Sequence, residues 1–443
     1  MLAYSNPLSC GAQGQPASLD GQQKQIDLTL EVLPITLPDE LSFRVELNSY
    51  GTPGGEAERN YYRLAHRYRC CVNHLPYSQS GSVRSGCAPT LVDGRLDWTE
   101  WDRRFGPYLD GSAFADLPRS GVPLGEFYLP LHENWPGDIN KAWDGHYWAD
   151  QAFPEWYRAL FVDVSRQFAE HFAAKGWTRT QFQFYLNNKN SWKVSGSRSG
   201  SSPWVLDEPV DQKDFAALAY FARAFHEGIA PVKGDVDILF RIDISRPQWQ
   251  RNTLDGLVGL AVVSQSSFDR YNRMVRERAE KNGEVLFVYG SANELDRSSV
   301  GLVGWAVGTW AKGADGILPW QTMGQDASWE EADRLAVLYP AKSRFGRPAS
   351  SAGLPGAYPS LRLVAFRRGQ QDVEYVNFLR TATGADRDTL ARALTVALGL
   401  ADEGVIVRED FSPGTLDFWS LDADRFARLR SFLQHELLAH RPN

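Results

Sequence analysis

The chain has 443 residues, of which 43% are hydrophobic, 12% aromatic and 23% charged. This composition is typical of a globular protein and excludes a disordered or collagen-like polymer. The formal net charge is −7 with acidic and basic residues interspersed, so no basic face is available for nucleic acid. No apolar run approaches the roughly 20 residues of a membrane helix. We therefore expect neither a nucleic-acid nor a membrane partner.

The cysteines and the N-terminus carry no strong signal. The chain has four cysteines, at positions 10, 70, 71 and 87, and their spacing fits neither a metal site nor a disulfide framework. Leu8, Ser9 and Cys10 resemble a lipoprotein cleavage site, but no apolar segment precedes them. We predict no signal peptide and leave the location undetermined, cytoplasmic by default. The histidines are scattered without paired spacing, so no metal site is expected.

Eight short apolar segments, bounded by turn residues, predict strands, and most are separated by helical patterns. In chain order we expect a strand at 41–47, a helix at 56–68, strands at 70–75 and 126–131, a helix at 153–175, a strand at 181–186, a helix at 213–227, strands at 236–242 and 257–263, a helix at 268–281, a strand at 285–289, a helix at 298–312 and a strand at 316–320. This order predicts an α/β fold, a (β/α)8 TIM barrel. An open doubly wound sheet is the alternative, but no glycine-rich phosphate loop follows the first strand.

Segments on both sides of the barrel complete the predicted domains. Residues 22–34 alternate polar and apolar like one half-buried strand, which must dock on the barrel or on a second copy, so a homodimer is open. A helix at 360–379 should close the barrel, and helices at 386–400 and 424–440 should flank a short strand at 405–408. We predict an N-terminal β segment at 1–34, a barrel at 35–382 and a small, mostly helical C-terminal extension at 383–443.

Polar and aromatic residues gather where the predicted strands end, which is where barrel enzymes place their active sites. Loop solvation explains any one of them, but the repetition on strand after strand favours a binding site. Trp320 is the expected platform under a sugar ring, and Arg241 and Asp243 either pair with each other or bind substrate hydroxyls. The candidate binding residues are Asn48, Tyr77, His132, Glu133, Asn134, Asn187, Asn188, Arg241, Asp243, Tyr289, Glu294 and Trp320.

Two neighbouring carboxylates, Asp207 and Glu208, follow an apolar triplet and precede Pro209. Charge at such a place is costly unless it has partners or a use. Glycosidic cleavage needs one carboxylic acid to protonate the leaving oxygen and a second group to stabilise the positive centre. When the sugar carries a 2-acetamido group, that group can be the nucleophile and the second carboxylate can polarise it. A structural alternative is that the pair complements the dipole of the helix that follows.

Three segments together resemble glycoside hydrolase family 123 and the related domain of unknown function 4091 group. They are Asp207-Glu208-Pro209, the strand-eight run GADGILPW at 313–320, and the helix at 359–375 that ends in RRGQQDVEY. The resemblance covers about residues 30–380. It implies a (β/α)8 barrel preceded by a β-sandwich and β-N-acetylgalactosaminidase activity, with the substrate acetamide as nucleophile. It also implies Glu208 as general acid/base, Asp207 as the residue that polarises the acetamide, and a glycan with a terminal N-acetylhexosamine as substrate. No metal or organic cofactor is expected from the resemblance.

The chain departs from the family pattern in two places. Residues 187–202 are inserted between the fourth strand and the carboxylate pair, and the N-terminal sandwich is almost absent. Two other functions therefore remain open. Glu294, just after the seventh strand, could serve as the carboxylate nucleophile of an ordinary retaining pair with Glu208. Alternatively, the chain is a carbohydrate-binding barrel without catalysis.

Overall fold

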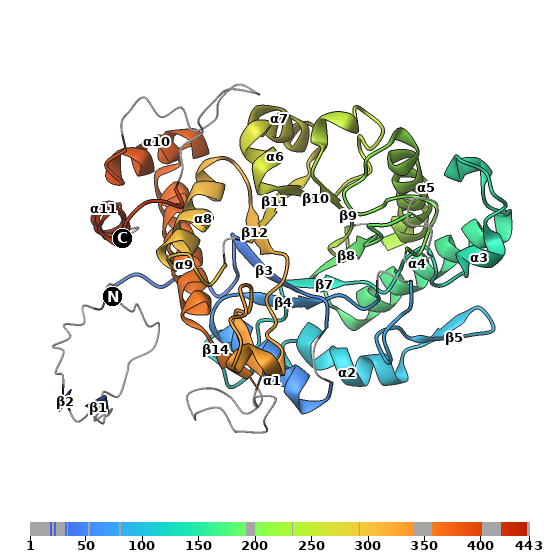
Figure 1. Ribbon diagram of the computed structural model, residues 1–443, viewed down its shortest axis with the longest axis horizontal. Helices are drawn as coiled ribbons and strands as arrows, with labels where there is room; N and C mark the ends of the chain where they lie inside the picture. Colours follow the sequence, from blue (N-terminus) through green and yellow to red (C-terminus); the bar gives the residue numbers. More distant parts are fainter. Residues whose placement is uncertain are drawn as a thin grey trace.

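Eight parallel strands form one sheet that is nearly closed into a barrel, with the helices outside it (Figure 1). Their spatial order is β4-β3-β12-β11-β10-β9-β8-β7. The bounds are β3 Arg44–Ser49, β4 Cys71–His74, β7 Glu126–Tyr128, β8 Gln181–Tyr185, β9 Ile238–Ile244, β10 Leu260–Ser264, β11 Val285–Gly290 and β12 Gly316–Pro319. This confirms the predicted (β/α)8 TIM barrel and its eight strands.

The computed structural model describes residues 18–19, 22–23, 32, 34–51, 54–78, 81–191, 200–232, 234–291, 293–340, 357–400 and 418–440. Within these ranges, the predicted helices are found as α1 Glu56–Arg67, α4 Glu155–Lys175, α5 Gln212–Ile229, α8 Val300–Ala311 and α9 Leu361–Thr383. The helix predicted at 268–281 is two helices, α6 Gln265–Arg270 and α7 Asn272–Asn282, because the backbone of Tyr271 leaves the helical region.

The ring is closed by side chains where the first and last strands of the sheet meet. β4 and β7 lie next to each other without a ladder of backbone bonds. The Asn73 side chain of β4 accepts a hydrogen bond from the backbone N of Tyr128 in β7 at 2.9 Å. The thiol of Cys71 also points to the Glu126 carbonyl, at 3.4 Å. These contacts satisfy backbone groups that an open sheet edge would leave unpaired.

The connection between β4 and β7 has structure that the sequence analysis did not predict. It contains the antiparallel hairpin β5 Thr90–Val92 and β6 Arg95–Asp97, then α2 Thr99–Leu109 and η1 Ser112–Phe114. Asp93 and Gly94 both have a positive φ at the hairpin turn, as the Asp-Gly dipeptide favours. Further short elements are α3 Ile139–Ala142, η2 Ala149–Gln151, η3 Ala230–Val232, η4 Pro247–Trp249, η5 Asp326–Trp329 and the antiparallel pair β13 Leu338–Pro340 and β14 Ala357–Pro359.

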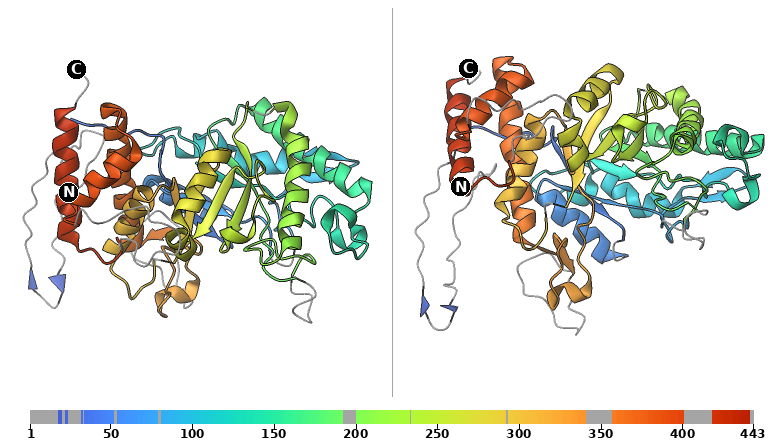
Figure 2. Two further views of the ribbon diagram at one scale, coloured as in Figure 1. Left: turned by 90° about the horizontal axis from the view of Figure 1, so that it is seen from above. Right: turned by 45° about the horizontal axis from the view of Figure 1, so that its top comes forward.

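The C-terminal helices α10 Arg387–Ala397 and α11 Ala423–Ala439 pack beside α8 and α9 on one side of the barrel (Figure 2). Arg430 of α11 donates from Nε to the buried carboxylate of Asp372 in α9 at 2.8 Å. This confirms the mostly helical C-terminal extension, while its boundary at residue 383 stays a prediction. The strand predicted at 405–408 lies outside the described residues.

The N-terminal β segment is a two-stranded antiparallel pair, β1 Ser18–Leu19 and β2 Gln22–Gln23, which does not join the eight-stranded sheet. Most of the strand predicted at 22–34 lies outside the described residues.

The interior of the barrel divides into two halves of different chemistry. One is the apolar half, a buried cluster on β9 to β12 made of Leu239, Leu260, Val262, Phe287 and Leu318. The other is the polar half, in which buried polar side chains of β3, β4, β8 and β9 bond to one another. Its members are Glu46, Asn73, Gln183 and Arg241.

Candidate active site

The pair Asp207 and Glu208 lies at the carboxyl ends of β8 and β9, although about twenty residues separate it from β8 in the sequence. The chain leaves β8 at Asn188 and returns to the same residue, whose carbonyl accepts the backbone N–H groups of Leu206 at 2.8 Å and Asp207 at 3.0 Å. The next backbone N–H, of Glu208, bonds to the Asp243 carbonyl at the end of β9, also at 3.0 Å. These backbone bonds therefore hold Asp207 and Glu208 at the ends of β8 and β9, although residues 187–202 come between β8 and the pair in the sequence.

Asn188 is the residue that closes this loop. It is 1% exposed, and its amide donates to the Ser202 hydroxyl at 3.0 Å and to the Trp204 carbonyl at 2.6 Å. Its side-chain oxygen accepts the backbone N–H of Ser201 at 3.0 Å. With its amide and its carbonyl both engaged, Asn188 contributes to the site by holding the loop; its predicted binding role stays a prediction.

The two carboxylates differ in exposure. The side chain of Asp207 is 3% exposed, whereas that of Glu208 is 27% exposed. Glu208 also has a φ of 57°, in the left-handed region that a residue with a β-carbon rarely adopts. Such a conformation costs on the order of 1 kcal/mol and is common at active sites. One acid is thus enclosed and the other is partly exposed to solvent.

Lys189 lies between the two carboxylates. Its Nζ is 3.6 Å from Oδ2 of Asp207 and 3.5 Å from Oε2 of Glu208. Burial opposes the charge on this lysine, but the two carboxylates outweigh that effect and raise its pKa. Burial raises the pKa of Asp207 to about 8; the attraction of Lys189 opposes the rise, and repulsion from Asp243 and Glu208 adds to it. Asp207 is therefore much harder to ionise than a free aspartate.

Arg241 lies beneath the pair and is the centre of the polar half of the barrel. It is 1% exposed and binds Asp243 bidentately, from Nε at 2.7 Å and from Nη2 at 2.8 Å. Its Nη1 donates to Glu46 at 2.8 Å. The guanidinium also lies against the rings of Tyr128 and Tyr185, 4.9 and 4.5 Å from their centroids. Arg241 and Asp243 thus pair with each other, which is one of the two roles that the sequence left open. Binding of substrate hydroxyls by these two residues stays a prediction.

Aromatic rings form the wall beside the pair. Tyr77 and Tyr185 are buried together, and Tyr50 packs on them. Burial and the charge of Asp207 raise the pKa of Tyr50 to about 12. The Tyr77 hydroxyl accepts the backbone N–H of Asn187 at 2.9 Å and donates to the Tyr185 carbonyl. The side-chain amide nitrogen of Asn187 is buried with no partner among the described residues, which leaves it a donor for a ligand.

The predicted residues after β7 hold loops together. His132 has both ring nitrogens next to carbonyls, of Pro130 at 3.2 Å and Gly81 at 3.0 Å, and burial lowers its pKa to about 4. Glu133 is fully buried and accepts the Ser201 hydroxyl; burial raises its pKa. Asn134 donates to the Ser201 carbonyl at 2.9 Å. Through these contacts all three side chains hold the surrounding loops together. Their contact with substrate stays a prediction.

The remaining predicted residues lie over β3, β11 and β12. Asn48 accepts the Tyr128 hydroxyl at 2.9 Å and donates to the Trp320 carbonyl at 2.8 Å. Tyr289 packs on the apolar half of the interior. The Trp320 residue is 38% exposed at the end of β12. These rings offer the flat apolar surface on which a sugar ring stacks.

Glu294 is engaged by two arginines. Its carboxylate lies 3.1 Å from Nε of Arg297 and 3.0 Å from an Nη of Arg334, and its side chain is 20% exposed. A nucleophile in this position would have to act while paired with both guanidinium groups.

Three residues of the site are not in the list of candidate binding residues: Tyr50, Lys189 and Tyr185. Lys189 follows two asparagines just after the end of β8, and a position at the carboxyl end of a barrel strand could have indicated a site residue. It was not singled out because a lysine in a polar loop is ordinarily solvated. Tyr185 alternates with Gln183 on β8 and therefore faces the barrel interior with it. Period-two alternation could have identified this tyrosine.

Within the described ranges, no three or more His, Cys, Asp or Glu side chains are grouped as metal ligands would be. None of the described helices is long and apolar enough to cross a bilayer.

No protein-family model and no curated protein matches the sequence. Solved structures that superpose on the chain include a family 123 glycoside hydrolase from Clostridium perfringens, analysed for the hydrolysis of glycolipid glycans. It has 12% identity and a TM-score of 0.49, over 92% of this chain and 72% of that one. Others are a β-galactosidase from Marinomonas ef1 (9% identity, TM-score 0.40, 79% of this chain and 61% of that one) and an endo-β-1,4-mannanase from Thermotoga petrophila (10%, 0.41, 75% and 77%). The chain is thus similar to these proteins at low identity.

Proposed function

We propose that the protein is a glycoside hydrolase that removes a terminal β-linked N-acetylhexosamine, with N-acetylgalactosamine as the preferred sugar. The observation that carries this proposal is the pairing of a buried Asp207 with a half-exposed Glu208 at the carboxyl ends of β8 and β9. Resemblance to family 123 in the segments around 207–209, 313–320 and 359–375 supports it.

In the proposed mechanism, Glu208 donates its proton to the glycosidic oxygen as the bond to C1 breaks. The acetamide oxygen of the same sugar attacks C1 and forms a cyclic oxazolinium, while Asp207 accepts the acetamide N–H and stabilises its growing positive charge. Water, deprotonated by Glu208, then attacks C1 and opens the ring. The configuration at C1 is retained, and each group ends in the protonation state in which it began.

The test is turnover of an aryl β-N-acetylgalactosaminide by the wild type and by Glu208→Gln. We expect the substitution to lower kcat/KM at least about a thousandfold, since the general acid is removed while size and packing are kept. Unchanged activity would remove Glu208 from the mechanism. A panel of aryl glycosides with and without the 2-acetamido group tests the substrate class, and cleavage only of those without it would contradict the proposal.

Glu294→Gln distinguishes the retaining Glu208/Glu294 mechanism from substrate assistance. If Asp207 and the acetamide act as proposed, Glu294→Gln changes kcat/KM by less than about tenfold. A thiazoline analogue of the oxazolinium should then inhibit competitively. Loss of all turnover in Glu294→Gln with no binding of the thiazoline would favour the other pair. Glycan binding with no hydrolysis of any panel member would favour a carbohydrate-binding barrel.

A further inference from the structure

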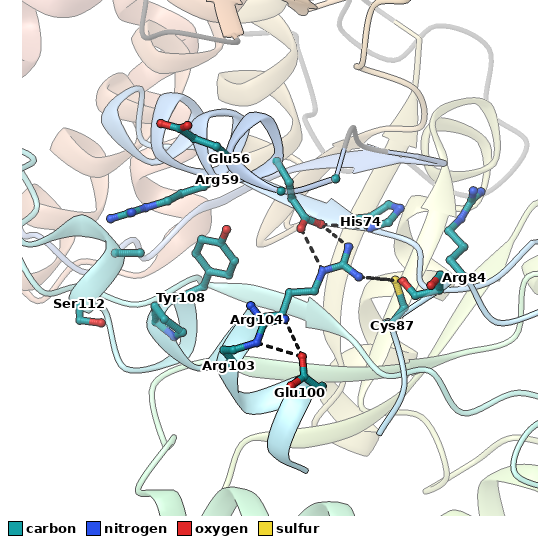
Figure 3. A pocket seen from close by; sticks show the side chains of 17 residues that line it. Glu56, Arg59, His74, Arg84, Cys87, Glu100, Arg103, Arg104, Tyr108 and Ser112 are labelled. Carbon is teal, nitrogen blue, oxygen red and sulfur yellow. Dashed lines mark hydrogen bonds and ion pairs between the residues drawn. The ribbon is translucent and has the colours of Figure 1, made fainter. Parts of the chain in front are cut away.

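Cations and carboxylates are matched differently at the proposed active site and in a cavity of about 1060 Å³ between α1 and α2 (Figure 3). In the cavity, Arg104 binds Glu58 from Nε at 3.0 Å and from Nη2 at 2.8 Å. Arg103 lies 2.6 Å from Glu100, and Figure 3 shows these two side chains directed at each other. Each of these two acids therefore has an arginine of its own.

At the proposed active site, one ammonium group is shared by two carboxylates. Nζ of Lys189 lies 3.6 Å from Oδ2 of Asp207 and 3.5 Å from Oε2 of Glu208. Both distances exceed the roughly 2.7–2.9 Å of a tight charge-assisted hydrogen bond. Among the described residues, no other cation lies within 4.0 Å of either acid. Lys189 therefore attracts both carboxylates and is bound tightly to neither.

The backbone places Lys189 next to the pair. Its neighbour Asn188 accepts the backbone N–H of Asp207 at 3.0 Å, so the lysine and the aspartate extend from adjoining stretches of chain. The Lys189 side chain is 41% exposed, which keeps its ammonium in contact with water while it lies between the acids. Lys189 belongs to the inserted residues 187–202. The insertion thus supplies the cation of the pair.

Three tyrosines around the pair stay uncharged between pH 6 and pH 9. Burial raises the pKa of Tyr50 to about 12, and it raises the pKa values of Tyr77 and Tyr185 well above the ordinary value. The charge of Asp207 adds to the rise in all three. None of these hydroxyls therefore changes the charge of the site in that range.

The other charged groups beside the pair are Arg241 and Asp243, which bind each other at 2.7 and 2.8 Å. Burial opposes the charge of Lys189, but the attraction of the two carboxylates outweighs it and raises the pKa of this lysine, so it stays protonated. The pKa of about 8 at Asp207, which burial raises, therefore marks the loss of the last proton of the pair.

The proposed mechanism needs one ionised acid, which accepts the acetamide N–H, and one protonated acid, which donates to the glycosidic oxygen. One ammonium compensates one carboxylate, and ionising the second then meets repulsion from the first. We propose that Lys189 is a positioning residue for this reaction, whose ammonium holds a single negative charge on the pair while the second acid keeps its proton. This inference rests on the proposed function.

The first experiment is the pH profile of kcat/KM for the aryl β-N-acetylgalactosaminide with wild type, Lys189→Met and Lys189→Arg. Without the cation, each proton of the pair leaves at higher pH, so in Lys189→Met the fall of kcat/KM near pH 8 should move upward by about one pH unit. Lys189→Arg keeps the positive charge and should stay within about 0.3 pH unit of wild type. A Lys189→Met profile that is lower at every pH without being shifted would mean a merely structural role and would overturn the inference.

Lys213→Met is the matched control. Lys213 lies at the start of α5, is paired with Asp211 at 3.0 Å and has a side chain that is 22% exposed. Its removal takes away the same charge without touching the pair, so the fall near pH 8 should not move. A shift in Lys213→Met as large as in Lys189→Met would mean a general effect of net charge and would overturn the specific role of Lys189.

Thermal unfolding of the full chain gives a readout that needs no turnover. Above pH 8 the pair carries a second negative charge, so Lys189→Met should lower Tm by about 1–2 °C more at pH 9 than at pH 6. In an Asp207→Asn background the pair can carry only one charge, and the losses at the two pH values should be equal. Equal losses in the wild-type background as well would overturn the inference.

The two readouts separate this inference from the proposed function. If the wild type cleaves the aryl glycoside, and Lys189→Met shifts neither the pH profile nor the unfolding as stated, the role of Lys189 fails alone. If the wild type cleaves no aryl glycoside, the proposed function fails. A loss of Tm that is larger at pH 9 than at pH 6 would then still assign the charge balance of the pair to Lys189.

Discussion

The two halves of the barrel interior differ in what they contribute. The apolar half, on β9 to β12, is built from Leu260, Val262, Phe287 and similar side chains and is stabilised by packing alone. The polar half encloses Arg241 with Glu46 and Asp243, and its charges are tolerated because each has partners at 2.7–2.8 Å. The carboxylate pair of Asp207 and Glu208, for which we propose a catalytic role, lies over the polar half. Charge held in fixed positions under a site is what electrostatic catalysis requires, whereas a hydrophobic floor requires only shape.

Of the substitutions considered, Arg241→Met should lower the free energy of unfolding most. It leaves Glu46 and Asp243 buried without their cation, so the free energy of unfolding should fall by about 3–5 kcal/mol. Denaturant unfolding at pH 7 measures this. Combining Glu46→Gln with Arg241→Met should recover part of the loss, because one unpaired charge is removed. A loss below about 1 kcal/mol in the single variant would show that the guanidinium is not what stabilises these acids.

The pH dependence of catalysis tests how the polar half sets the charge of Asp207. Burial raises the pKa of Asp207 to about 8, and only its ionised form can accept the acetamide N–H. Because the proposed reaction also needs a proton on Glu208, kcat/KM for the aryl N-acetylgalactosaminide should fall about tenfold per pH unit above roughly pH 8, where the pair has lost its last proton. A value of kcat/KM that still rises between pH 7 and pH 9 would show that this pair does not carry the transferred proton.

Ionisation of the Asp207 carboxyl should lower the free energy of unfolding as pH rises. The pKa of Asp207 is raised from 3.8 to about 8 on folding, so between these values the native state binds more protons than the unfolded state. Its contribution to stability is therefore complete below pH 3.8 and is lost as pH rises toward 8. At pH 8, Asp207→Asn should be more stable than wild type by on the order of 2 kcal/mol. Identical thermal unfolding of both proteins at pH 8 would contradict this.

Phe287→Leu is the matched change in the apolar half, and we expect the smallest effect from it. Removing part of one buried ring should cost about 1 kcal/mol in the free energy of unfolding. The pH profile of catalysis should keep its shape, because no charge is disturbed. If Phe287→Leu shifted the pH dependence of kcat/KM as much as a substitution in the polar half does, the distinction between the two halves would fail.

Two of the three segments that resemble family 123 have structural reasons for their composition. In the helix at 359–375, Glu374 accepts the backbone N–H of Ser42 at 2.8 Å at the start of β3, and Asp372 binds Arg430. In the strand-eight run, Gly316 lies so close to Phe287 that a β-carbon would approach its ring to 2.7 Å. The composition of these two segments is thus explained by packing and hydrogen bonding, and of the three segments only that at 207–209 enters the proposed mechanism.

The sequence by itself determined the eight strands, most of the helices and the candidate pair, because the spacing of apolar residues is local and records which face of an element is buried. The tertiary structure alone decided that Asn188 returns the inserted loop to β8 and places Lys189 between the acids. It also placed both ring nitrogens of His132 next to backbone carbonyls and left Nε2 of His74 buried without a partner among the described residues. These features depend on neighbours far away in the chain, since burial, charge and hydrogen bonding are set by what surrounds a side chain. Periodicity along one segment carries no record of those neighbours.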